Sequence, residues 1–194
     1  MMATLVKLYT VSGDWTGAKY CGLTINWDYT NRTVDISIPG YIERALQRFQ
    51  HPPPTRPEHS PHAWQKPTYG AKTQYASSPD TSPAIDAADT NHLQQVLGTL
   101  LFYARAVDSS MLPALNTLAS QQASGTKATL EALTHLLNYC ATHPDAMIRY
   151  GASDMCLWLD SDASYLTAPK ARSRNAGYHF LSKRPEDPNK PPQH

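Results

Sequence analysis

Three segments between residues 90 and 144 carry apolar residues at helical spacing, and this pattern constrains the fold most. In the first segment the apolar positions follow the i, i+3, i+4, i+7 rule, and Asp89 or Thr90 is the expected N-cap. Three amphipathic helices joined by short links predict a bundle that buries a shared face. The segments are residues 90–107, residues 112–119, and the stretch between the N-cap Thr126 and the terminating pair His143-Pro144.

Gly98 lies inside the first of these predicted helices. Glycine within a helix costs about 1 kcal/mol relative to alanine. Close approach of a neighbouring backbone is one explanation for this glycine, and plain tolerance of the residue is the other.

Short β-rich runs precede the helices. Residues 20–27 and 33–38, separated by a polar turn at residues 28–32, predict a β-hairpin. Pro39-Gly40 ends the second strand, and the apolar spacing of residues 42–49 predicts a short helix after it. Strands together with a helical bundle predict an α+β fold.

Two aspartates follow an apolar run near the C-terminus. Residues 155–160 place apolar side chains on both faces, which predicts a strand inside a covered sheet. Asp160 and Asp162 lie two residues apart, so both carboxylates are expected on one face near the end of that strand. Paired carboxylates suit Mg²⁺, which completes its shell with water and substrate phosphates. The alternative is that one aspartate caps a loop and the other is solvated.

The sequence around these aspartates resembles a known family. Residues 161–164 read Ser-Asp-Ala-Ser, and after a basic loop residues 172–174 and 177–181 read Arg-Ser-Arg and Gly-Tyr-His-Phe-Leu. This order resembles the start of the RNase H domain in copia-type retrotransposon polyproteins. The resemblance implies that Asp162 is the first metal-binding carboxylate of a Mg²⁺ site. The family's next catalytic residue is a glutamate on a later helix, and the chain reaches His194 in a proline-rich run before such a helix.

The rest of the chain resembles the preceding part of the same polyprotein. Residues 5–49 resemble the end of a reverse transcriptase palm running into the thumb, and residues 95–105 resemble the thumb and connection region. The expected organisation is a truncated palm and thumb start (1–50), a proline-rich, partly disordered connector (51–88), a three-helix thumb/connection bundle (89–145), the first two strands of an incomplete RNase H-like sheet (146–184) and a disordered tail (185–194).

This organisation predicts a chain that is catalytically inactive alone. Two of the palm carboxylates of reverse transcriptases are adjacent aspartates, and the sequence contains no adjacent pair of aspartates. Asp162 alone cannot assemble a two-metal hydrolase, so stable Mg²⁺ binding is not expected without the remainder of the polyprotein. One alternative is a module that binds an RNA–DNA hybrid or a DNA duplex. Another is a hydrolase in which Asp160 and Asp162 recruit Glu131, Asp145 or Asp154.

Cationic side chains are the candidate contacts to nucleic-acid phosphates. Two lie in the predicted short helix after the hairpin, and three lie in the basic loop after the aspartates. The alternative for the first two is the solvated face of an amphipathic helix. Seventeen Lys and Arg against sixteen Asp and Glu give a net charge of +1, which does not by itself indicate a nucleic-acid binder. The candidates are Arg44, Arg48, Lys170, Arg172 and Arg174.

A metal site in the connector is not expected. Its histidines, His51, His59 and His62, follow no familiar zinc spacing, and no cysteine is near them.

The composition favours an intracellular protein, cytoplasmic or nuclear. The three cysteines are scattered, which favours reduced thiols over a disulfide framework. The sequence lacks both a run of the roughly 18 apolar residues that span a bilayer and a signal-peptide pattern at Met1, so no membrane association is expected.

Overall fold

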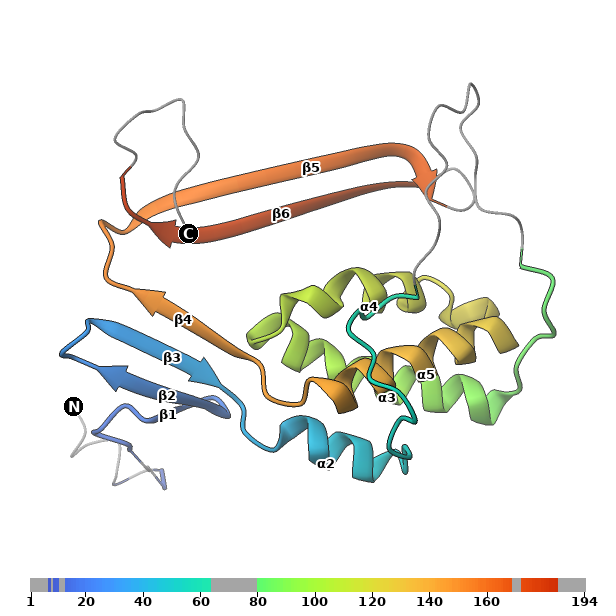
Figure 1. Ribbon diagram of the computed structural model, residues 1–194, viewed down its shortest axis with the longest axis horizontal. Helices are drawn as coiled ribbons and strands as arrows, with labels where there is room; N and C mark the ends of the chain where they lie inside the picture. Colours follow the sequence, from blue (N-terminus) through green and yellow to red (C-terminus); the bar gives the residue numbers. More distant parts are fainter. Residues whose placement is uncertain (1–6, 8, 11–12, 64–79, 169–171, 185–194) are drawn as a thin grey trace.

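The computed structural model describes residues 7, 9–10, 13–63, 80–168 and 172–184 (Figure 1). Within these residues the chain forms four α-helices and two antiparallel sheets, so the α+β prediction is confirmed. No described helix is long and apolar enough to cross a membrane. The helices are α2 (Tyr41–Arg48), α3 (Ala87–Ala106), α4 (Leu112–Ala119) and α5 (Lys127–Thr142), with the short 3-10 turns η1 (Ser109–Met111) and η2 (Gln122–Ser124) on either side of α4.

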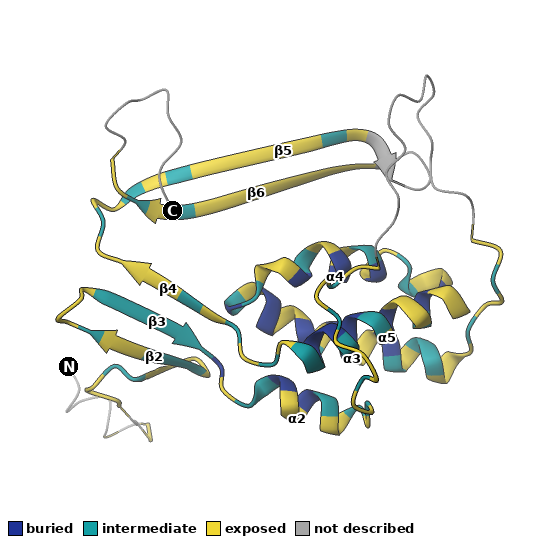
Figure 2. Ribbon diagram, viewed as in Figure 1, coloured by how far each residue is buried: buried dark blue, intermediate teal, exposed yellow. Residues whose placement is uncertain are grey.

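One apolar core joins all four helices. Figure 2 shows the buried positions along the inner sides of α2 to α5. Ile42 of α2 is fully buried with side chains of the later helices, so this short helix is part of the same packing unit. Burial raises the pKa of the Cys140 thiol to about 12. The largest fully buried side chains are Tyr103, Ile42, Leu93, Leu100, Met111, Leu136, Val96 and Cys140.

Helix α3 begins one turn earlier than predicted. Asp86 is its N-cap, and the Asp86 carboxylate accepts a hydrogen bond of 2.8 Å from the backbone N–H of Asp89. The prediction of Asp89 or Thr90 as N-cap is therefore wrong. Two alanines, good helix formers, follow Asp86, so the helix extends back to the first acceptor that satisfies its free N–H groups.

Helix α5 begins and ends where the sequence predicts. The Thr126 hydroxyl accepts from the Thr129 N–H at 3.3 Å, and the Thr129 hydroxyl accepts from the Thr126 N–H at 3.1 Å. These reciprocal bonds satisfy two of the donors that a helix start leaves unpaired. The helix ends at Thr142, and His143 is its C-cap.

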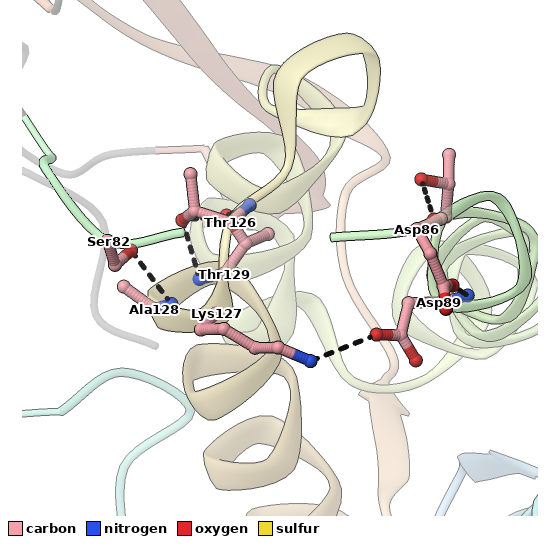
Figure 3. A network of polar contacts seen from close by, with 8 residues as sticks. Ser82, Asp86, Asp89, Thr126, Lys127, Ala128 and Thr129 are labelled. Carbon is pink, nitrogen blue, oxygen red and sulfur yellow. Dashed lines mark hydrogen bonds and ion pairs between the residues drawn. The ribbon is translucent and has the colours of Figure 1, made fainter. Parts of the chain in front are cut away.

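The segment before α3 is attached to the start of α5 (Figure 3). The Ser82 hydroxyl accepts from the Ala128 N–H at 3.3 Å, and Lys127 forms an ion pair of 3.3 Å with Asp89. Asp80 accepts a hydrogen bond from the Thr126 hydroxyl. This end of the predicted connector therefore packs on the bundle, while residues 64–79 lie outside the described residues.

Gly98 is exposed on α3, and among the described residues a Cβ atom added there would meet no atom within 4 Å outside the backbone of its own helix. Close approach of a neighbouring backbone therefore does not explain why a glycine occupies this helix position. The remaining explanation is that the helix tolerates glycine there. We expect Gly98→Ala to raise the free energy of unfolding by about 0.5–1 kcal/mol, because alanine loses less backbone entropy in a helix. Urea denaturation followed by circular dichroism measures this change.

Gly22 provides a matched control for this substitution. A Cβ atom there also meets nothing within 4 Å, but its φ of 84° lies in the left-handed region. Gly22→Ala is therefore expected to destabilise the chain. A loss of stability on Gly98→Ala would contradict the open space seen around that residue.

The first sheet combines strands from distant parts of the chain. The predicted hairpin is confirmed as β2 (Leu23–Asp28) and β3 (Thr33–Ser37), preceded by β1 (Lys19–Tyr20). The fourth strand of this sheet, β4 (Met147–Gly151), follows α5 in the chain and pairs antiparallel with β3. The order is β1-β2-β3-β4, so the whole bundle is inserted between two paired strands.

Two details of this sheet differ from simple strand periodicity. The sequence predicts Tyr20 and Trp27 in one strand, but Cys21 and Gly22 have φ values of 48° and 84° and form a tight turn between β1 and β2. The organisation expected from the sequence places residues 147–151 in the same unit as the strands that follow them. The structure instead pairs these residues with β3 of the N-terminal hairpin.

The second sheet is a long hairpin of β5 (Cys156–Ala168) and β6 (Arg172–Ser182). The predicted covered strand is wrong, because the side chains of Leu157, Leu159 and Leu181 are 62%, 60% and 44% exposed. Their register places these leucines on one face, and Figure 2 shows the hairpin largely exposed. Within the part of the chain that the structure describes, this sheet has only two strands, which is too few to bury an apolar face.

Candidate nucleic-acid interface

The predicted carboxylate pair lies on one exposed face of β5. Asp160 is opposite Tyr178 and Asp162 is opposite Ala176 on β6. Residues two apart on a strand project to the same side, as predicted. Their expected place near the strand end is wrong, because pairing with β6 extends β5 to Ala168.

No third ligand joins this pair in the described part of the chain. The described residues contain no group of three or more His, Cys, Asp or Glu side chains that is arranged to hold a metal ion. Glu131, Asp145 and Asp154, considered above as recruits, therefore form no such group with the pair. The Asp154 carboxylate accepts from the Arg184 N–H at 2.9 Å instead.

The basic tract after the aspartates is partly strand. Arg174 lies in β6 opposite Ser164, and its guanidinium donates to the Thr117 hydroxyl of α4 at 3.3 Å. Arg174 thus attaches the hairpin to the bundle. For Arg172 the structure describes the backbone at the start of β6 and not the side chain, and Lys170 lies outside the described residues.

Arg44 and Arg48 lie one turn apart on the exposed side of α2, while Ile42 and Ala45 face the core. The Arg48 guanidinium lies 5.4 Å from the centre of the Phe49 ring, a cation–π contact. The Arg44 guanidinium has a long contact of 3.5 Å to the carbonyl of Pro39. Neither arginine forms an ion pair with any described residue, so both charges are open to solvent.

The two groups of candidate cations do not form one surface. Figure 1 shows α2 and the hairpin of β5 and β6 on opposite sides of the helix bundle. Arg44 and Arg48 therefore face a different region from Arg174.

Sequence reasoning missed a contact between the connector and α5. The first described part of the connector, residues 51–63, is called the strap here, and it crosses α5 (Figure 1). Its polar contacts are His51 Nε2 to Asn138 Oδ1 at 2.8 Å, the Glu58 N–H to the Thr142 hydroxyl at 3.0 Å, His135 Nε2 to the Ser60 carbonyl at 3.0 Å, and His59 Nδ1 to His143 Nε2 at 3.1 Å.

The three connector histidines do not converge. His51 contacts Asn138 of α5, whereas His59 contacts His143, the C-cap of that helix. Burial lowers the pKa of His62, and the charges of Arg174 and His135 lower it further. The polar residues spaced along α5 were the sequence signal for its contact with the strap. Their partners lie more than 70 residues away in sequence, so the spacing did not identify them.

Comparison with protein-family models, with curated proteins and with solved structures finds no match.

Proposed function

We propose that this chain is part of a copia-type retrotransposon polyprotein and spans the palm end, the thumb and connection helices, and the first two RNase H strands. One observation carries the proposal. Two of the three tracts with the strongest resemblance, residues 161–164 and 172–181, lie in the two strands that pair, with Asp162 in the middle of β5. A first and a second RNase H strand are expected to pair in this way.

The apolar face of the hairpin supports the same assignment. Leu157, Leu159 and Leu181 are exposed on one face of a two-stranded sheet. Exposed apolar patches of this kind mark surfaces that another part covers. The partner we propose is the remainder of the polyprotein, which would add strands to this sheet.

We propose further that the chain alone catalyses neither DNA synthesis nor RNA cleavage. Two-metal phosphoryl chemistry needs several carboxylates around two ions. The exposed oxygens of Asp160 and Asp162 suit Mg²⁺ as one side of such a site, and Mg²⁺ bound there would activate water in the complete assembly. The sequence has no adjacent aspartates, and the described residues add no third ligand to the pair.

Duplex binding through α2 is the second candidate function. The observation in its favour is that Arg44 and Arg48 are exposed and free of ion pairs with described residues. Arginine guanidinium groups bind phosphate strongly, and each contact that releases a counterion makes binding weaker as salt rises.

We expect the purified chain to bind an RNA–DNA hybrid in a salt-sensitive way without cleaving it in Mg²⁺. A fluorescent hybrid titrated at two salt concentrations and read again after an hour measures both properties. Arg44→Gln/Arg48→Gln should weaken binding and reduce the salt slope by about 2. The charge-matched control is Lys127→Gln/Arg149→Gln, because both of these cations already form ion pairs with aspartates.

The outcomes separate the two candidates. Hybrid cleavage or primer extension by the chain would contradict the inactivity we propose. An absence of binding, or equal loss in both double variants, would contradict duplex binding through α2 and leave the assignment to the polyprotein standing.

A further inference from the structure

Two histidines from distant parts of the chain meet at the end of α5. His59 belongs to the strap, and His143 is the C-cap of α5. His59 Nδ1 lies 3.1 Å from His143 Nε2, and the ring planes are inclined by 61°. Both residues are exposed, so ions in solution can reach them.

The separation of the two nitrogens matches that of two ligands on one metal ion. With Zn–N bonds of about 2.0–2.1 Å, two ligands of a tetrahedral ion lie about 3.3 Å apart, and neighbouring ligands of an octahedral ion lie about 2.9 Å apart. The observed 3.1 Å falls between these values. At this separation, a rotation of the two rings would bring both nitrogens within bonding distance of one ion.

The surroundings leave the ring nitrogens available. In the described part of the chain, these nitrogens form no hydrogen bond except the one between them. The neighbouring Tyr139 ring lies 5.1 Å from the His143 ring, but its hydroxyl is engaged with Asp108 at 3.2 Å and with Ser110 at 2.9 Å. An ion entering the site therefore displaces a single hydrogen bond.

We propose that His59 and His143 form a binding site for a divalent transition-metal ion such as Zn²⁺ or Ni²⁺. Neutral imidazole suits these ions, whereas Mg²⁺ prefers oxygen ligands. Each ring gives one lone pair to the ion: the ring that donates the hydrogen bond transfers that proton to its other nitrogen through solvent, and water fills the other positions. The bound ion links the strap to the C-terminal end of α5, and the site is independent of the aspartate pair on β5.

Calorimetric titration of the full chain with ZnCl₂ and with NiCl₂, at neutral pH in a buffer that does not bind metals, tests this site. We expect saturable binding that His59→Ala and His143→Ala each weaken at least about tenfold. His51→Ala is the matched control, because His51 lies in the same strap but contacts Asn138, and it should leave the affinity unchanged. Asp162→Asn should also leave it unchanged.

Thermal unfolding supplies a second readout. Zn²⁺ should raise the Tm of the wild-type chain and of His51→Ala but not that of His59→Ala or His143→Ala, because only an ion bound to the folded state stabilises it. Circular dichroism of each variant confirms that the exposed substitutions leave the fold intact. Equal affinity in wild type and His59→Ala, or no binding up to about 1 mM metal, would overturn the proposal and leave the pair as a hydrogen bond only.

Discussion

Replacing Leu136 with alanine is expected to lower the free energy of unfolding by about 2–5 kcal/mol. Leu136 is completely buried on α5 within the shared core of the helices. Its truncation removes apolar contacts and leaves a cavity that the surrounding helices fill only in part. Chemical denaturation followed by circular dichroism measures the loss.

Leu101 on α3 is the matched control, because the same substitution there removes a side chain that is 37% exposed. We expect Leu101→Ala to cost less than about 1 kcal/mol. Similar losses for the two variants would contradict the placement of Leu136 in the core and of Leu101 at the surface.

Tyr103→Phe is expected to lower the free energy of unfolding by about 1–3 kcal/mol. The Tyr103 hydroxyl donates to the Pro144 carbonyl at 3.0 Å and accepts from the Ala146 N–H at 2.8 Å. The ring is buried and stacks on Tyr41 with 5.5 Å between centres. Phenylalanine keeps the ring packing but leaves both backbone groups without this partner.

Tyr150→Phe is the control for the loss of a hydroxyl, because Tyr150 is 43% exposed. A change within about 0.5 kcal/mol is expected there. If Tyr103→Phe were as neutral as this control, the link from α3 to the segment between α5 and β4 would not contribute to stability. Denaturation curves of both variants, compared at equal m values, measure the change in the free energy of unfolding.

Local signals in the sequence predicted most of the helices and the first hairpin. The apolar spacing of α3, α4 and α5 and the cap at Thr126 act within a few residues, because helix hydrogen bonds and caps join near neighbours. The turn between β2 and β3 is local in the same sense. The family resemblance likewise depends on short tracts and their order, and it stays a proposal.

Contacts between distant residues were decided only by the tertiary structure. The pairing of β3 with β4, the attachment of the strap to α5 and the meeting of His59 with His143 each join residues that are more than 70 positions apart. Periodicity predicts which face of an element is apolar but not which element covers it. For this reason the sequence predicted a covered β5, whereas its leucines are exposed.

The same distinction applies to the candidate interface. The sequence by itself determined that Asp160 and Asp162 share a face and that Arg44 and Arg48 share another, because strand and helix periods decide this. Only the tertiary structure decided that α2 and the β5–β6 hairpin lie on opposite sides of the bundle. The physical reason is that contacts between distant residues position each element: α2 shares a core with the later helices, whereas the hairpin contacts α4 through Arg174 and Thr117.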